Sequence, residues 1–211
     1  MRYLLLFVLF SFSTNTFAQN DFEKQLDSIQ NETQASSFIQ NHKHNQGKLL
    51  VFNKEKHKSQ LAKALFTLGS GSKKIFKTDV DKTFYKVIDK YETPYYRVSY
   101  VFLDGSKKSI EDITKLRQEI IAKYNKGVQF KALAKNYSMD ESAKKGGDTG
   151  WFKAGELNPE FEQAVIKEPH TIDAIFTVDV PEKQAYYVVV KTYDSKNIEE
   201  IKVLKVTEPL N

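Results

Sequence analysis

The stretch between Tyr137 and Phe152 holds the residues whose types and spacing are best suited to chemistry. It is a polar loop that contains several glycines and ends in Trp151 and Phe152. Glycine permits positive φ and close backbone approach, and the aromatic rings supply large apolar faces beside the loop. Together with Leu157 and Phe161 downstream, the pattern predicts an apolar dish with Asp140 at its edge. Spacing alone leaves open a plain apolar core beside a solvated acid.

Other kinds of site have little support in the sequence. The chain has no cysteine, which excludes disulfides, zinc–thiolate sites and thiol nucleophiles. His42 and His44 have no carboxylate or thiol nearby, so we expect no metal and no cofactor. The net charge of +5 comes from basic residues interleaved with acids, so nucleic acid is not an expected partner.

The first eighteen residues have the pattern of a cleavable signal peptide. A basic start precedes the apolar run Leu4 to Phe10, which is too short to cross about 30 Å of hydrocarbon as a helix. Small residues follow at Thr16 and Ala18, where signal peptidase requires them. We expect cleavage after Ala18, a mature chain in the periplasm or secreted, and no stable membrane insertion. A buried N-terminal helix is the alternative.

The remaining elements must hold the loop in place, and they divide near Pro94. The length of 211 residues allows one to two domains. We predict four segments: a signal peptide (1–18), an N-terminal module (19–92), a second module (94–195) and a tail (196–211). In the second module we expect strands at 96–103, 175–178 and 186–190, and helices at 110–124, 130–137 and 159–166. This order argues for an α+β sheet packed against helices.

The two modules share a repeated pattern at a shift of 100 residues. Residues 47–80 match residues 147–180 at seven positions, among them the paired Phe52 and Phe152. Chance similarity between two amphipathic segments is the alternative. The repeat predicts that the N-terminal copy is truncated, because the equivalent of strand 96–103 would precede the chain. The tail at 198–208 has strand composition, and we expect it to pair with the N-terminal module.

The motif as a whole resembles a known family. Ser-x-Asp-x-Ser-Ala-x-x-Gly-Gly-Asp-x-Gly-Trp-Phe begins at Ser138 and is followed by Gly155-Glu-Leu157 and Pro159-Glu-Phe161-Glu-x-Ala164. Over residues 95–193 this is similar to the parvulin-type (rotamase, PpiC-like) peptidyl-prolyl cis-trans isomerases. The resemblance implies a four-stranded antiparallel sheet surrounded by helices, preceded here by a truncated, degenerate parvulin-like α+β module. It also implies a foldase that acts on X-Pro bonds of unfolded or proline-containing exported polypeptides.

The resemblance assigns roles to individual residues. Asp140 matches the family's acidic or cysteine position, and Leu157 and Phe161 match the pocket that holds the proline ring. The same pocket would include Phe152 and Trp151. It would also include Thr149, which lies where the family often has leucine.

Two positions depart from the family pattern. The family carries histidines in its first and last strands, and here those positions are Tyr100 and Tyr187. We expect both hydroxyls to join Asp140 in a hydrogen-bond network, with simple strand packing as the alternative. Loss of both histidines leaves a rival function open, a weak or inactive parvulin-like holdase for unfolded exported proteins. The sequence leaves the oligomeric state undecided.

Overall fold

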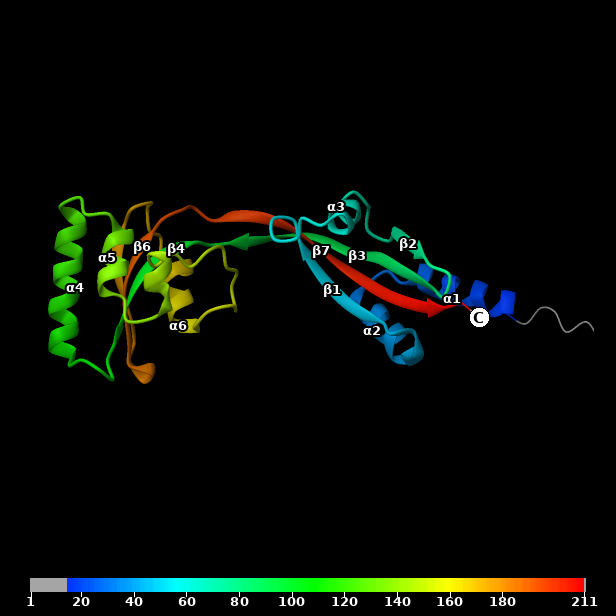
Figure 1. Ribbon diagram of the computed structural model, residues 1–211, viewed down its shortest axis with the longest axis horizontal. Helices are drawn as coiled ribbons and strands as arrows, with labels where there is room; N and C mark the ends of the chain where they lie inside the picture. The colour runs from blue at the N-terminus through cyan, green and yellow to red at the C-terminus, as the bar shows by residue number, and fades with distance from the viewer. Residues whose placement is uncertain (1–14, 211) are drawn as a thin grey trace, which may run out of the picture. The chain divides into compact units, whose positions relative to one another are not determined.

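A computed structural model describes residues 15–210 of the chain. The chain divides into unit 1, Met1–Glu92 with Glu199–Asn211, and unit 2, Thr93–Ile198 (Figure 1). Most of the predicted signal peptide, residues 1–14, lies outside the described residues, and residues 15–18 begin the first helix. Among the described helices, none combines the length and apolar character needed to cross a membrane.

Unit 2 follows the order of elements that the sequence predicts, with small changes in their ends. Its elements are β4 (Val98–Asp104), α4 (Ile110–Asn125), α5 (Phe130–Tyr137), α6 (Pro159–Glu162), β5 (Ile175–Val180) and β6 (Ala185–Lys191). Helix α4 has Ser109 as its N-cap, because the Ser109 hydroxyl accepts a hydrogen bond from the Asp112 amide at 3.2 Å. The helix predicted at 159–166 is α-helical for one turn and continues as a π-helix over Gln163–Lys167.

The sheet of unit 2 has three regular antiparallel strands in the order β4-β6-β5. In place of a regular fourth strand, the segment that contains Asp148 and Phe152 lies along the free side of β4. Single bridges join Tyr96 to Phe152 and Ser99 to Asp148. The irregularity has a cause at Gly147, which has a φ of +84° and lies so close to β4 that a Cβ atom would be 2.3 Å from the Tyr100 carbonyl oxygen. This loop therefore reaches the strand because it has glycine there.

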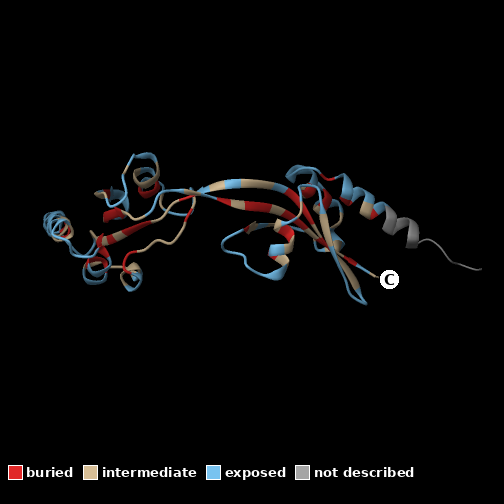
Figure 2. Cartoon of the chain, turned by 90° about the horizontal axis from the view of Figure 1, so that it is seen from above, coloured by how far each residue is buried: buried red, intermediate tan, exposed pale blue. Residues whose placement is uncertain are grey.

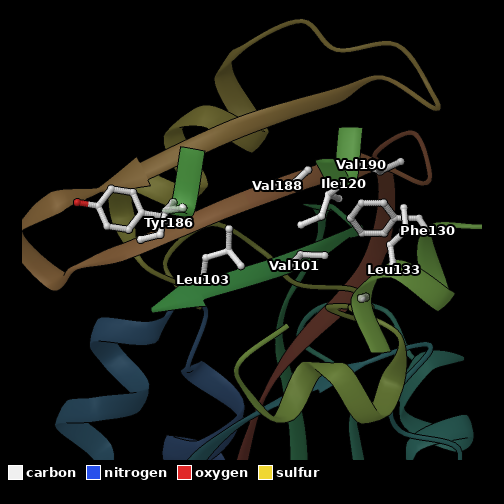
Figure 3. Packing of buried hydrophobic residues seen from close by; sticks show 10 residues of the cluster. Val101, Leu103, Ile120, Phe130, Leu133, Tyr186, Val188 and Val190 are labelled. Carbon is white, nitrogen blue, oxygen red and sulfur yellow. The ribbon is translucent and has the colours of Figure 1, made fainter. Parts of the chain in front are cut away.

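Helices cover both faces of this sheet. Against α4 and α5 the sheet buries a continuous apolar cluster (Figure 3), formed by Val101, Leu103, Ile113, Ile120, Phe130, Leu133, Ala134, Tyr186, Val188 and Val190. The opposite face packs against α6 through a second cluster, formed by Val98, Phe152, Phe161, Val178 and Val189. Among the candidate site residues, Phe152 and Phe161 belong to this second cluster, and Tyr100 and Tyr187 pack against it.

Unit 1 is built from both ends of the chain. Its elements are α1 (Asn15–Ser28), α2 (Glu32–Asn41), β1 (Lys48–Asn53), α3 (Gln60–Phe66), β2 (Lys73–Lys77), β3 (Asp81–Tyr95) and β7 (Lys196–Pro209). The strand order is β1-β7-β3-β2, so the C-terminal strand is an inner strand of the sheet. The chain passes between the units within β3 and again within β7.

Strand β7 contributes to the core on both of its faces. It pairs antiparallel with β1, from Lys48 opposite Lys205 to Asn53 opposite Glu200. On one face it adds to a cluster with α1 and α2, and on the other to a cluster that includes Leu65 of α3. The buried positions of the long strands appear as red bands in Figure 2. The tail thus pairs with the N-terminal unit, as its composition predicts.

Candidate functional site

Three aromatic rings meet on the α6 face of the unit 2 sheet. Tyr100 lies on β4, Tyr187 on β6 and Phe161 on α6, and their ring centroids are 5.0–5.7 Å apart in edge-to-face arrangements. The sheet register explains the first two positions, because Tyr187 pairs opposite Phe102, two residues beyond Tyr100 on the same strand. With Leu157 and Asn158 these rings line a cavity of about 100 Å³.

The predicted apolar residues have distinct positions around this cavity. Phe161 is 4% exposed and forms its floor, whereas Leu157 is 38% exposed and forms its open rim. Phe152 does not line the cavity, unlike the prediction, but is buried in the adjoining cluster, with its ring centroid 6.1 Å from that of Tyr96. An open rim above a buried aromatic floor gives an apolar group from solvent a place to dock.

Asp140 is fixed at the end of α5 by several donors. One carboxylate oxygen, Oδ1, accepts hydrogen bonds from the Ser138 hydroxyl at 2.8 Å and from the amide and hydroxyl of Ser142 at 3.1 and 2.5 Å. In this way Asp140 caps the 3-10 helix Glu141–Lys145. The other oxygen, Oδ2, accepts a hydrogen bond of 2.9 Å from the Tyr100 hydroxyl. The acid is therefore joined directly to the aromatic cavity.

Both tyrosines are held in the neutral form. Burial, followed by the nearby Asp140 charge and the hydrogen bond to it, raises the pKa of Tyr100 to about 12. Burial and the Asp140 charge also raise the pKa of Tyr187. The expected network is smaller than predicted, because within the described residues no hydrogen bond joins the Tyr187 hydroxyl to Asp140 or Tyr100. The hydroxyl of Tyr187 thus remains available to a ligand.

Thr149 and Trp151 lie outside the cavity, contrary to the prediction. The Thr149 hydroxyl lies within hydrogen-bond distance of the Val98 amide and carbonyl, at 3.1 and 3.0 Å, and so fastens the loop to β4. Trp151 packs against Tyr193 at 5.6 Å, and the Lys196 ammonium lies 4.2 Å from its ring centroid. For Trp151 the physical reason is alternation, since neighbouring side chains of an extended segment point to opposite faces and Phe152 takes the inward one.

The same loop is held by an ion pair that the motif did not reveal. The Arg97 guanidinium donates two hydrogen bonds to Asp148, at 2.9 and 2.5 Å. The Arg97 guanidinium lowers the pKa of the Asp148 carboxyl, and Asp148 raises that of Arg97. This pair fixes the start of the bridged segment beside β4.

Two further residues shape the cavity and were missed from sequence. Asn158 caps α6, because its Oδ1 accepts a hydrogen bond of 3.0 Å from the Phe161 amide. The buried Nδ2 of Asn158 has no hydrogen-bond partner among the described residues. Glu162 is 8% exposed, and its carboxylate accepts hydrogen bonds of 2.8 Å from the amides of Gly155 and Leu157. In the sequence the only signal for this contact is that Glu162 lies five residues after Leu157, close enough for its carboxylate to accept hydrogen bonds from the amides of that loop.

We expect Glu162→Ala to loosen the rim of the cavity. The substitution leaves the amides of Gly155 and Leu157 without their acceptor, so unit 2 should lose about 1.5–3 kcal/mol of stability. Hydrogen exchange at those two amides should accelerate more than exchange in β4. Glu160→Ala, at an exposed neighbouring position, is the matched control. Equal exchange in the two variants would show that Glu162 does not hold this loop.

The three antiparallel strands, the bridged fourth segment and the helices on both faces make unit 2 a parvulin-like α+β domain. A family model described as the PPIC-type PPIASE domain matches residues 83–196, more than half of the chain. The chain belongs to this family.

Named relatives are similar to part of this chain. Foldase protein PrsA from Bacillus subtilis (strain 168) is 33% identical over 109 residues, which cover 50% of this chain and 33% of that protein. Chaperone SurA from Chromobacterium violaceum is 50% identical over 44 residues, or 21% of this chain and 10% of that protein. The crystal structure of PrsA from Bacillus subtilis aligns with a TM-score of 0.39 and 30% identity, covering 47% of this chain and 35% of that one. The chain spans about a third of the length of the first curated relatives it matches.

Proposed function

We propose that this protein is an exported foldase that catalyses cis-trans isomerisation of X-Pro bonds in envelope or secreted polypeptides. The observation that carries the proposal is the cavity lined by Tyr100, Leu157, Phe161 and Tyr187, with Asp140 bonded to its edge, in a PPIC-type domain. The relatives named as foldase and chaperone support a role with substrate polypeptides. The apolar run before Ala18 supports export.

The chemistry required is the weakening of amide resonance. Rotation about the X-Pro bond has a barrier of about 18–20 kcal/mol, because the planar amide has partial double-bond character. Phe161 and Leu157 would hold the proline ring in an apolar cavity, which disfavours the charge-separated planar amide relative to the twisted one. No covalent bond forms and no proton needs to be transferred, so tyrosines in place of histidines are compatible with this reaction.

The polar side of the site would stabilise the twisted amide. The Tyr100 hydroxyl already donates to Asp140, which fixes the orientation of both groups. The Tyr187 hydroxyl, on a half-buried side chain of the neighbouring strand β6, can donate a hydrogen bond to the substrate as the amide twists. Asp140 would therefore set the geometry and electrostatics at the edge of the cavity, while the rings and Leu157 bind the proline.

The pH dependence follows from the tyrosines. We expect isomerase activity to show no step between about pH 6 and 8 from these positions, where a histidine would titrate. The raised pKa of Tyr100 means that its hydroxyl stays protonated through pH 10, so its contribution to stability is lost only as the pH rises from about 10 towards about 12. A pH–rate profile of the full mature chain tests whether the activity has a step between about pH 6 and 8. A step near neutrality that disappears in Tyr100→Phe would contradict the assignment.

The rival is a holdase that binds unfolded chains without isomerising them. What favours the isomerase is the difference between the two units, since Asp140, Leu157 and Phe161 in unit 2 correspond at the shift of 100 to Gln40, His57 and Leu61 in unit 1. The residues of a proline pocket are thus present in unit 2 only. A general role in binding unfolded chains would not require this difference between the two units.

We also propose that unit 1 is a degenerate second copy completed by the tail. The order β1-β7-β3-β2 parallels that of the bridged segment followed by β4-β6-β5. In each unit two helices precede the outer segment and a short helix follows it. In this arrangement β7 takes the place that β4 has in unit 2, which supplies the first strand that the N-terminal sequence lacks.

The proposed activity is tested by refolding a substrate protein whose slow step is prolyl isomerisation. The mature chain should accelerate that phase, and Phe161→Ala should not, provided that circular dichroism shows the variant to be folded. Phe161→Leu keeps an apolar floor in case the alanine variant is unstable. A mature chain that suppresses aggregation without accelerating the slow phase would establish the holdase instead.

A further inference from the structure

Unit 1 carries an open row of lysine and aromatic side chains on one face of its sheet. The row is formed by Lys48 of β1, Lys205 of β7, Tyr85 of β3 and Lys74 of β2, with Phe76 beside it. Lys48 pairs opposite Lys205, and Lys74 opposite Tyr85. The Lys205 ammonium lies 5.8 Å from the Tyr85 ring centroid, which joins the two pairs across the sheet. We call these five residues the lysine–aromatic row.

The row lies on the face of the sheet away from α1 and α2. Phe84 packs into the cluster with those helices, whereas its neighbour Tyr85 packs at the margin of the cluster on the opposite face. Successive strand residues point to opposite faces, so Phe76 and the three lysines share the face of Tyr85. Helix α3 adds Leu65 to the cluster there. Phe76 is nevertheless 42% exposed and Lys48 is also exposed, whereas Lys74, Tyr85 and Lys205 are half-buried. The row is therefore most open to solvent at its two ends.

The lysines of the row lack the acidic partners that other lysines of the sheet have. On the face that α1 and α2 cover, Lys73 pairs with Asp27, Lys82 with Glu23 and Lys202 with Glu32. In the part of the chain that the structure describes, Lys48, Lys74 and Lys205 form no ion pair with any carboxylate. Three uncompensated cations in one row favour an anionic ligand.

The aromatic pair restricts the kind of ligand. Phe76 and Tyr85 have ring centroids 5.7 Å apart and an interplanar angle of 85°, so they form an edge-to-face pair. The Lys74 ammonium lies 5.6 Å from the Phe76 ring centroid. Two rings at right angles offer an apolar surface for side chains but no parallel platform for successive stacked bases. The chemistry therefore fits a polypeptide better than a single-stranded nucleic acid.

We propose that the lysine–aromatic row is a second binding site, which holds extended acidic segments of a client polypeptide. The proposal rests on the proposed function in so far as the ligand is a polypeptide, but it needs neither proline nor isomerisation. Carboxylates of the segment would pair with Lys48, Lys74 and Lys205, while an apolar side chain of the segment packs on Phe76 and Tyr85. Unit 1 would then bind clients by a chemistry that unit 2 does not share.

The test uses the full mature chain and short fluorescent peptides that contain no proline. One peptide alternates acidic and apolar residues, and the other has lysine at every acidic position. Binding is measured by fluorescence anisotropy at about 0.01 M and about 1 M salt, because the Debye length falls from about 30 to about 3 Å between them. We expect the acidic peptide to bind more tightly than the basic one and to be released by salt.

The triple variant Lys48→Glu/Lys74→Glu/Lys205→Glu should weaken binding of the acidic peptide at least about tenfold. The matched control reverses three exposed lysines elsewhere in unit 1, Lys24, Lys43 and Lys58, and gives the same net charge. Replacing the row's lysines with glutamine instead gives a milder variant if charge reversal perturbs folding. Isomerisation of a short X-Pro peptide should be unchanged in all of them, so failure at this site is distinguishable from failure of the proposed function.

Several results would overturn the proposal. These are equal binding by the row variant and the wild type, equal weakening in the matched control, or equal affinity for the basic peptide. Tighter binding of a single-stranded oligonucleotide would assign the row to nucleic acid instead. A change of oligomeric state in the row variant, without a change in peptide binding, would show that the row contacts a second copy of the chain.

Discussion

Asp140→Ala is expected to lower kcat/KM for X-Pro isomerisation by about 10- to 100-fold. The carboxylate accepts hydrogen bonds from Ser138, Ser142 and Tyr100. Its removal therefore takes away the cap of the 3-10 helix and also the acceptor of the Tyr100 hydroxyl. A hydrogen bond to a charged group contributes about 1.5–3 kcal/mol, which corresponds to this range of rates. A protease-coupled or NMR assay on a short X-Pro peptide measures the loss.

A second substitution separates the cap from the charge. Asp140→Asn keeps one carbonyl oxygen for Ser138 and Ser142 but presents an amide group to the Tyr100 hydroxyl. We expect it to fold as the wild type does while still losing activity. Asp194→Ala removes an exposed acid of the same unit and is the matched control. Full activity in Asp140→Ala would show that the rings and Leu157 suffice without the acid.

Deletion of residues 197–211 is expected to unfold unit 1 and leave unit 2 folded. The deletion removes an inner strand, so β1 loses its partner and both apolar clusters of unit 1 lose buried side chains. Hydrogen exchange should show lost protection in β1 and in the unit 1 part of β3, with protection kept in β4 and β6. A single change, Leu204→Ala at a fully buried position, should cost about 2–5 kcal/mol in the same unit.

The control for this deletion removes residues 209–211 alone. It takes away the hydrogen bond from the Leu210 amide to the Val80 carbonyl but keeps the paired length of β7 opposite β1. Protection in unit 1 should then remain close to that of the full chain. If deletion of 197–211 left protection in β1 and β3 unchanged, the tail would not be an essential strand of unit 1.

The sequence predicted the fold of unit 2 well because its signals are local. The capping serine at 109 and the turn before Gln184 fix the ends of α4 and β5 without reference to distant residues. The irregular fourth strand was not foreseen. It depends on Gly147 approaching the Tyr100 carbonyl, a contact between segments far apart in the chain. Positive φ at Gly147 is predictable, but its partner is not.

The cavity combines residues that the motif names with residues that it does not. Phe161 of α6 and Leu157 of the loop before it both line the cavity, together with Asn158. Trp151 lies elsewhere, since the alternation of an extended segment depends on where its bridges to β4 fall. The missing hydrogen bond of Tyr187 depends on side-chain distances across the sheet, which residue types do not specify.

The central claim is that the cavity on the α6 face isomerises X-Pro bonds. Two-dimensional NMR exchange spectroscopy on a short X-Pro peptide tests it most directly, because the spectrum reports the cis-trans rate on the peptide itself, with no coupled reaction. A catalytic amount of the mature chain should produce exchange cross-peaks between the cis and trans forms, and Leu157→Ser, at the exposed rim, should weaken them. Peptide resonances that shift on binding, with no exchange above the uncatalysed rate, would contradict the account.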